Sequence, residues 1–447
     1  MKNRIKNIII ANDTEAFSSI INSIEDKAQR ISKIRKEHFL SSRFLFWEGD
    51  NKIVITPFPV DKSIILYAKS LGYENIVNLF PENMDINLSD AIINDSCLMD
   101  RIVSIIRDNP KIIISSYCFT ESFSKLINIL RGQKLLFKVD QEPLNNAQWL
   151  VDYLGSKVGF RVETKDLSIP VPEFFICRGK KEVLDTVVWM YKKNKSSIIK
   201  VYSGEGGWGV YMVHRDEYSS EEELISKIKS ILNSDSIWNF YPFVVEEFIP
   251  SSNNDQSSPS LEIFIDDKCS KITYVCNQIV DKFGCFLGIV IGKNCVKTSI
   301  DKQIRKIGNA IGQRYFKLGY RGFLDVDFIM SKKGITFPIE TNVRRTGGTH
   351  VYDLTRHVFG DRWFSKTIAL SSDSFCYGEK ILSAENIFNK IKQILFPING
   401  KKEGVVLVAV DSYHCIFSCV IFGKTKQRVL DIHEKLTHIF KQDNIKK

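Results

Sequence analysis

The sequence predicts an α/β protein made of a parallel-sheet domain, a larger α+β part and a small α/β unit. Three observations lead to this class. Residues 1–140 alternate short apolar runs with helix-like segments, residues 141–375 contain two hairpin patterns, and residues 376–447 return to strands and helices. The chain has 447 residues, more than one ordinary hydrophobic core holds, so two to four domains are expected.

The first 140 residues fit an open, mostly parallel sheet. Strand-like apolar runs occupy 7–10, 51–58, 75–80, 111–117 and 134–139, and helical periodicity covers 14–37 and 96–109. Strands that alternate with helices in this way form βαβ units. The dinucleotide fingerprint GxGxxG is absent, so we expect a Rossmann-type layer without its cofactor loop.

The remaining elements follow from periodicity and punctuation. Residues 145–167 have a helical pattern, which the two prolines of IPVPEFF (169–175) bring to an end. Further strands are expected at 243–249, 261–267, 271–281, 323–330, 335–342, 404–410 and 415–423. Further helices are expected at 300–319, 385–395 and 426–440.

A glycine-rich hairpin is expected at 195–213, in KSSIIKVYSGEGGWGVYMV. Its turn holds Gly204, Gly206, Gly207 and Gly209, and Lys200 precedes the turn on the first strand. Glycines let backbone N–H groups approach an anion, so this strand–loop–strand suits a flap over nucleotide phosphates. It is not a Walker loop, which joins a strand to a helix and carries GK[ST]. The alternative is a tight hairpin that binds no ligand.

A second hairpin concentrates carboxylates. Side chains alternate along a strand, so Asp325 and Asp327 share one face, as do Glu340 and Asn342 on the next strand. If the strands pair through the SKKG turn (331–334), Asp327 and Glu340 converge. Two carboxylates and an amide oxygen are hard ligands that suit Mg²⁺ held together with phosphate oxygens. The alternative is a polar, solvated strand face.

The stretch FPIETNVRRTGGTH (337–350) continues from this hairpin. Arg344 and Arg345 suit bidentate binding of carboxylate or phosphate oxygens. A solvated strand face would leave these guanidiniums, and the Gly347–Gly348 pair, unexplained.

Composition narrows the class of protein. The formal net charge of +10 suits nucleic acid or an anionic small molecule such as ATP, but the lysines are scattered and no nucleic-acid-binding pattern appears. Ten cysteines at scattered spacings predict reduced thiols in a cytoplasmic protein rather than a zinc site or disulfides. No apolar run reaches 18 residues and the basic start reads as a strand, so we expect neither a membrane span nor a signal peptide.

These motifs, taken in order, resemble the ATP-grasp superfamily of carboxylate–amine ligases. The order is SKVGFR, IPVPE, SIIKVYSGEGGWGV, FVVEEFI, a strand with a glutamate, DVDF and IETN. RRTGGTH and SKVGFR further resemble the peptide-ligase branch with a pre-ATP-grasp domain, as in pheganomycin-type biosynthesis. The resemblance implies a Rossmann-like pre-ATP-grasp domain (1–140), an ATP-grasp domain (141–375) whose flap subdomain covers about 176–250, and a small C-terminal α/β domain (376–447).

The resemblance also implies site residues. The implied ATP-binding set is Arg161, Lys200, Ser203, Gly204, Gly206, Gly207, Glu246, Glu247, Ile249 and Glu262, and the implied Mg²⁺ (or Mn²⁺) set is Asp327, Glu340 and Asn342. Lys200 would contact phosphate, Glu246 to Ile249 would form the adenine hinge, and Glu262 would hold the ribose. The earlier cationic contact falls on Arg161, with Lys157 as the alternative.

One departure from the family concerns Asp325. D-alanine–D-alanine ligases carry an arginine at this place, two residues before the metal aspartate. The acyl-phosphate contact would then fall to Arg344 or Arg345, which argues against a D-alanine ligase. His350 would take a proton from the amine, orient substrate or merely cap a turn.

The implied activity is ATP-dependent joining of a carboxylate to an amine through an acyl phosphate, in specialised peptide or natural-product biosynthesis. The substrates would be amino acids or peptides, and a homodimer is an analogy from related folds. Three alternatives remain open: loading of an amino acid onto the thiol of an acyl carrier protein, a non-catalytic nucleotide-binding protein, and a nucleic-acid-binding protein.

Overall fold

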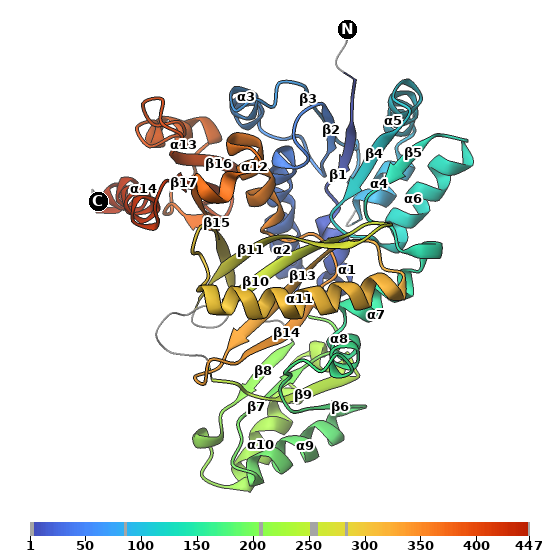
Figure 1. The fold of residues 1–447 in the computed structure, drawn as a ribbon, viewed down its shortest axis with the longest axis vertical. Coiled ribbons are helices and arrows are strands. Elements are labelled where there is room, and N and C mark those ends of the chain that lie inside the picture. The colour runs from blue at the N-terminus through green and yellow to red at the C-terminus, as the bar shows by residue number, and fades with distance from the viewer. Residues whose placement is uncertain (1–3, 85–86, 205–208, 251–257, 282–284, 446–447) are drawn as a thin grey trace.

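The computed structural model describes residues 4–84, 87–204, 209–250, 258–281 and 285–445, and it contains three sheets. In Figure 1 the N-terminal sheet lies in the upper part, the four-stranded sheet forms the lower end, and the long helix α11 (Thr298–Leu318) crosses the middle. The eight-stranded sheet lies between these parts and therefore sets their relative positions.

The N-terminal sheet is parallel, as the alternating pattern predicts. Its order is β3-β2-β1-β4-β5, with β1 (Asn7–Ile10), β2 (Lys52–Ile55), β3 (Ile76–Leu79), β4 (Ile112–Ser116) and β5 (Phe137–Val139). Its helices are η1 (Asp13–Phe17), α1 (Ser18–Ser23), α2 (Lys27–Leu40), η2 (Ser41–Phe46), α3 (Lys62–Ser70), α4 (Leu88–Asn94), α5 (Ser96–Asp108) and α6 (Glu121–Gly132). The chain passes from β1 to β2 and β3 on one side of β1 and then returns to β4 on the other side, so the crevice at the carboxyl ends of β1 and β4 is a topological switch point.

Two predicted helices are interrupted. The segment 14–37 breaks at Ile24, whose backbone is extended, and Asp26 then caps α2 by accepting a hydrogen bond from the N–H of Gln29 (2.7 Å). The segment 145–167 divides into α7 (Gln148–Gly155) and α8 (Lys157–Lys165), because Ser156 is extended and caps α8. In both places a polar N-cap outcompetes the continuing helical periodicity.

The four-stranded sheet is antiparallel and has its own core. Its order is β6-β9-β7-β8, with β6 (Phe174–Cys177), β7 (Ser197–Lys200), β8 (Val210–Val213) and β9 (Phe243–Glu247). The helices α9 (Lys180–Lys192) and α10 (Glu221–Leu232) pack against it, and η4 (Arg215–Glu217) and η5 (Ser236–Asn239) are short turns of the surrounding chain. The short η3 (Leu144–Asn146) lies at the end of α11, where the N–H of Leu144 donates to the carbonyl of Gly319 (2.9 Å).

The eight-stranded sheet positions the candidate site. Its order is β14-β13-β10-β11-β12-β15-β17-β16, with β10 (Ser258–Ile265), β11 (Ser270–Val280), β12 (Phe286–Gly292), β13 (Gly322–Met330), β14 (Thr336–Asn342), β15 (Ile368–Cys376), β16 (Gly404–Asp411) and β17 (Ile416–Gly423). Its other helices are α12 (Thr349–Phe359), η6 (Trp363–Ser365), α13 (Ala384–Ile391) and α14 (Lys426–Ile445). The C-terminal strands continue this sheet through β15; one of their faces packs a separate hydrophobic core and the other joins the main core. The division at 375/376 remains a prediction.

The two faces of this sheet differ in chemistry. Leu324, Val326 and Phe328 on β13 are fully buried, on the face opposite Asp325 and Asp327. That apolar face packs on α11, where Gly308 lies so close to Leu261 that a Cβ would come within 2.8 Å of it. Burial of the apolar face on α11 leaves the carboxylate face for the opposite side of the sheet.

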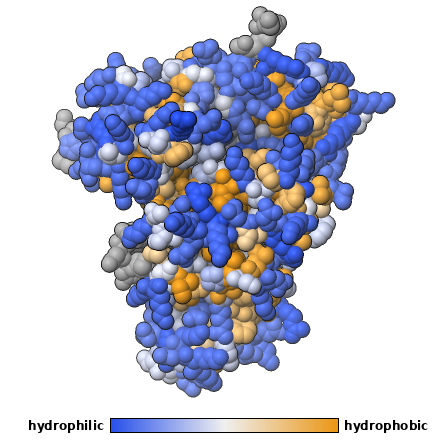
Figure 2. Space-filling view, in the orientation of Figure 1, coloured by the Kyte–Doolittle hydropathy of each residue, from blue (hydrophilic) through white to orange (hydrophobic). Residues whose placement is uncertain are grey.

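The visible surface is polar. Figure 2 shows a mostly hydrophilic face with scattered apolar patches rather than one continuous apolar band. Among the described residues, no helix combines the length and apolarity that crossing a bilayer requires.

Candidate active site

The carboxylate hairpin pairs in the predicted register. Across β13 and β14, Asp327 lies opposite Glu340 and Asp325 lies opposite Asn342. The four side chains therefore share the face turned away from α11.

Each carboxylate of β13 has a hydrogen-bond donor. Gln278 on β11 donates to Asp327 (2.6 Å), Asn342 donates to its other oxygen (3.1 Å), and Ser260 on β10 donates to Asp325 (2.6 Å). Burial, and then the charge of Glu340, raise the pKa of Asp327. Burial, and then the charge of Asp327, raise the pKa of Asp325 well above its usual range. The face has more negative charge than its partners neutralise.

Two buried lysines reach this region from different elements. Lys157, at the start of α8, forms an ion pair with Glu340, and Lys200, at the end of β7, forms one with Glu246 on β9. Arg161, one turn after Lys157, also pairs with Glu246 (2.6 Å) and donates to the carbonyl oxygens of Pro338 (2.9 Å) and Ile339 (3.2 Å). The small sheet, α8 and β14 are thus joined by charged contacts.

The charged side chains of this group shift one another's pKa values. Burial opposes ionisation of Glu246, but Arg161 and Lys200 outweigh it and lower the pKa of this carboxyl. Burial lowers the pKa of Lys200, although Glu246 opposes the shift. For Glu340 the order is the same as for Glu246: burial raises the pKa, and Lys157 more than reverses it.

The predicted ATP-binding residues do not all lie in this group. The structure brings Lys200, Glu246 and the alternative Lys157 together with the hairpin, and it buries Arg161 among protein partners. Ser203 is exposed and Gly204 is half-buried at the start of the flap, whereas Gly206 and Gly207 lie outside the described residues. At Gly209 (φ +71°) a Cβ would come within 2.2 Å of Val201, so the end of the flap requires glycine.

The predicted hinge and ribose residues have other partners. Glu247 pairs with Lys195 (2.8 Å), its N–H donates to the carbonyl of Glu173 (2.8 Å), and Ile249 is half-buried just beyond β9. Glu262 is fully buried on β10 and accepts hydrogen bonds from Thr273 (2.9 Å) and Thr349 (2.5 Å). The ribose role of Glu262 remains a prediction, and these hydroxyls already occupy its carboxylate.

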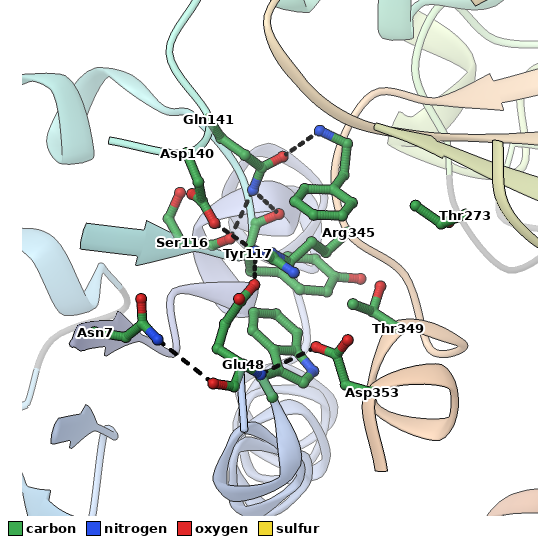
Figure 3. A network of polar contacts seen from close by, with 12 residues as sticks. Asn7, Glu48, Ser116, Tyr117, Asp140, Gln141, Thr273, Arg345, Thr349 and Asp353 are labelled. Carbon is green, nitrogen blue, oxygen red and sulfur yellow. Dashed lines mark hydrogen bonds and ion pairs between the residues drawn. The ribbon is translucent and has the colours of Figure 1, made fainter. Parts of the chain in front are cut away.

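The two adjacent arginines have different surroundings. Arg345 is only 1% exposed and pairs with Glu48 (2.8 Å) and Asp140 of the N-terminal domain, and Figure 3 shows it between these carboxylates. Burial lowers the pKa of Arg345, but Asp140 and Glu48 outweigh this and raise it. Arg344 is half-buried over the rings of Phe17 (5.1 Å) and Tyr117 (5.5 Å). Of the two arginines, Arg344 is the one exposed enough for its guanidinium to contact a substrate.

His350 lies at the start of α12. It is fully buried, and burial, with the charge of Arg43 acting in the same direction, lowers its pKa to about 3. An imidazole with this pKa is a poor proton acceptor for an amine at neutral pH.

Sequence reasoning missed Gln278 and Ser260. Both face the carboxylates because β10 and β11 lie next to β13 in the sheet. In the sequence, the one signal for these two residues is that a polar residue falls on the same face of its strand as Glu262. This signal points to the carboxylates only when the order of the strands in the sheet is known.

The chemistry of the hairpin fits a divalent cation. Asp327 and Glu340 face each other across two strands, and a cation would relieve the repulsion that raises the pKa of Asp327. In the part of the chain that the structure describes, no three His, Cys, Asp or Glu side chains form a metal cluster, so the site would be completed by ligand oxygens. By the chemistry and register of their donor atoms, Asp327, Glu340 and the Asn342 amide are the residues that would hold Mg²⁺ together with phosphate oxygens.

Of the comparisons with known proteins, the one with solved structures identifies the fold of this chain. No protein-family model matches this sequence, and none of the curated proteins does. Three solved structures match over nearly the whole chain. One is N5-carboxyaminoimidazole synthase from Aspergillus clavatus with ADP and 5-aminoimidazole ribonucleotide, with a TM-score of 0.56 and 8% identity over 98% of this chain and 99% of that one. The second is phosphoribosylamine–glycine ligase from Thermotoga maritima, with a TM-score of 0.55 and 16% identity over 96% of this chain and 97% of that one. The third is the biotin carboxylase domain of 2-oxoglutarate carboxylase from Hydrogenobacter thermophilus with MgADP, ADP and bicarbonate, with a TM-score of 0.53 and 12% identity over 96% of this chain and 88% of that one.

At these identities the likeness concerns the fold. All three structures are ATP-grasp ligases, and their coverage confirms the predicted α/β class with the ATP-grasp fold. The pheganomycin-type branch, the domain limits and the site residues remain predictions.

Proposed function

We propose that this chain, which has the fold of ATP-grasp ligases, joins a carboxylate to an amine at the expense of ATP, releasing ADP and phosphate. The observation that carries the proposal is the charged contact between the two sheets. Lys157 and Lys200, from α8 and the small sheet, are directed at the group formed by Glu246, Glu340 and Asp327. Buried lysines beside a cation-binding carboxylate pair match the needs of a phosphoryl-transfer site.

The roles follow from position. Lys200 and Lys157 would hold phosphate oxygens, and Arg161 would keep Glu246 and the β14 backbone in place. Asp327, Glu340 and Asn342 would hold Mg²⁺, which when bound neutralises phosphate charge. The flap that begins at Ser203 would close over the nucleotide and keep water from an acyl phosphate.

Arg344 would steady the substrate carboxylate. The carboxylate oxygen attacks the γ-phosphorus, the bond from phosphorus to the ADP oxygen breaks, and an acyl phosphate and ADP result. The amine, in its neutral form, then forms a C–N bond to the carbonyl, the C–O bond to phosphate breaks, and the proton lost from nitrogen leaves with the phosphate. Arg344 is placed for this because its charge acts on Glu340 while its guanidinium lies over Phe17 and Tyr117 of the N-terminal domain.

The finer proposal is that both substrates are amino acids or short peptides. It is supported by the resemblance of RRTGGTH and SKVGFR to the peptide-ligase branch. Loading of a carrier-protein thiol uses the same first half-reaction, so the acceptor separates the two.

The test is release of ADP and phosphate from MgATP with pooled amino acids and short peptides. Release should depend on the pool and should fall at least ~100-fold in Glu340→Ala, because the proposed cation loses a carboxylate. Glu182→Gln is the matched control, since Glu182 pairs with the exposed Arg178 on α9 far from the hairpin. Undiminished turnover in Glu340→Ala would refute the metal assignment, and absence of ATP binding would refute the proposed function.

A further inference from the structure

A second polar cluster lies between the N-terminal domain and the large sheet. Arg43 on η2 lies 3.7 Å from Asp13, just after β1, and 3.8 Å from Asp373 on β15. These distances are too long for hydrogen bonds, which need about 2.7–3.2 Å. All three side chains are more than nine-tenths buried.

The cluster contains polar atoms that have nothing to bind. Within the described structure, Asp13 Oδ2, Arg43 Nε and Asp373 Oδ1 are buried without a hydrogen-bond partner. An unpaired buried polar atom costs roughly 1–3 kcal/mol, so native proteins rarely leave several together unless a ligand or water fills the site.

Charge identifies the missing group. Two carboxylates face one guanidinium, and no other cation of the described residues lies within 4 Å of either carboxylate. On α2, Lys36 and Glu37 also act on Asp373, with opposite signs. Burial raises the pKa of Asp13 to about 8 and that of Asp373 to about 6, shifts that an added cation would reverse. The cluster therefore needs a positively charged hydrogen-bond donor.

The cluster is one aromatic ring away from the candidate active site. The guanidiniums of Arg43 and Arg344 each lie 5.5 Å from the centre of the Tyr117 ring. Tyr117 follows β4 and Asp13 follows β1, so the two residues flank the switch point of the parallel sheet, where ligands commonly bind.

Gly347 lies directly against the cluster. A Cβ on Gly347 would come within 3.0 Å of Asp373 Oδ2 and 2.9 Å of Phe286, and both Gly347 and Phe286 are partly exposed. A larger residue at 347 would therefore press on the Asp373 carboxylate. This accounts for one glycine of RRTGGTH that the phosphate site does not use.

We propose that the amino group of the amine substrate binds as an ammonium between Asp13 and Asp373, beside Arg43. The inference rests on the proposed ligase function and names the substrate class: a primary amine that is protonated before reaction, as in an amino acid or a peptide N-terminus. A neutral nucleophile would not need the two carboxylates.

The test separates activation of the carboxylate from use of the amine. Hydroxylamine, which is uncharged at pH 7.5, captures an acyl phosphate as a hydroxamate. We expect Asp13→Asn and Asp373→Asn to form hydroxamate from MgATP and the carboxylate within about twofold of the unmodified protein. The KM for the amine should rise about tenfold or more in each, because a charge-assisted hydrogen bond is lost. Asp361→Asn, which changes an exposed aspartate beyond α12, should alter neither value.

Three outcomes of this test decide between the ammonium site, a cluster filled only by water, and a protein that is not a ligase. A raised KM for the amine with hydroxamate formation retained supports the ammonium site. An unchanged KM in both folded variants would show that the cluster holds only ordered water, and would overturn the inference while leaving the ligase function intact. Absence of hydroxamate from the unmodified protein would overturn the ligase function, and the inference with it.

Discussion

Replacing Arg345 by methionine tests whether Arg345 stabilises the fold while the adjacent Arg344 serves the substrate. Arg345 is the cation between Glu48 and Asp140, and its guanidinium also lies over the rings of Trp47 (4.6 Å) and Phe323 (3.8 Å). Methionine fills much of the same volume but leaves two carboxylates without their counter-charge. Breaking a buried ion pair from one side costs about 3–5 kcal/mol.

The size of the chain sets the expected shift. An unfolding entropy of about 2.1 cal/mol/K per residue gives ~0.9 kcal/mol/K for 447 residues, so Arg345→Met should lower the Tm by about 3–5 °C if the chain unfolds as one unit. The contacts of Arg344 with the rings of Phe17 and Tyr117 are together worth about 0.5–1 kcal/mol at a half-buried site, so we expect Arg344→Met to cost less stability than Arg345→Met.

The assay is thermal and urea unfolding of both variants, with ADP release measured beside it. We expect Arg345→Met to lose stability and Arg344→Met to lose turnover. Adding Asp140→Asn to Arg345→Met should restore part of the stability, since one uncompensated charge disappears. Equal, small losses of stability in both single variants would refute the structural role of Arg345.

Three further predictions concern the charged groups. Asp13→Asn should flatten the pH dependence of stability, because the raised pKa of Asp13 in the folded protein, about 8, gives the native state an extra bound proton between about pH 4 and 8. In the unmodified protein this proton makes the unfolding free energy fall by up to ~1.4 kcal/mol per pH unit as pH rises. Urea unfolding of both proteins across this pH range measures the slope, and identical slopes would contradict the prediction. Asp327→Asn should weaken binding of ADP by roughly tenfold in Mg²⁺ but not in EDTA, as measured by calorimetry, and an equal loss in EDTA would argue against a metal role. Lys200→Met should weaken ADP binding about tenfold, whereas Lys193→Met, on the exposed end of α9, should not; equal affinities would remove Lys200 from the phosphate site.

The carboxylate hairpin was within reach of sequence reasoning, and the arginine environments were not. Asp327 and Glu340 meet because strand alternation and a short turn fix a local register, and both can be read from neighbouring residues. Arg345 finds Glu48 and Asp140 at separations of 297 and 205 residues, so its burial depends on how domains pack. Helix periodicity likewise predicted one helix where caps at Asp26 and Ser156 begin new ones.

The cluster around Arg43 shows the same limit more strongly. Asp13, Arg43 and Asp373 come from η1, η2 and β15, which are far apart in sequence. None of them belongs to a recognisable motif, because a polar residue after a strand is common at any loop. Only the sheet order, with Asp13 at the switch point, gives such a residue a reason to matter.

The continuity of the large sheet limits how the protein can be divided. β15 pairs with β12 over Ile368–Leu370 on one side and with β17 over Ile368–Cys376 on the other. A fragment that stops at Cys376 would carry the whole candidate site and yet present an unpaired edge of nine residues. Such an edge is a template for association with other chains, so a shortened version should precipitate or oligomerise even though its chemistry is complete. The residues after Cys376 thus cover an edge of β15 that would otherwise be open to pairing with other chains.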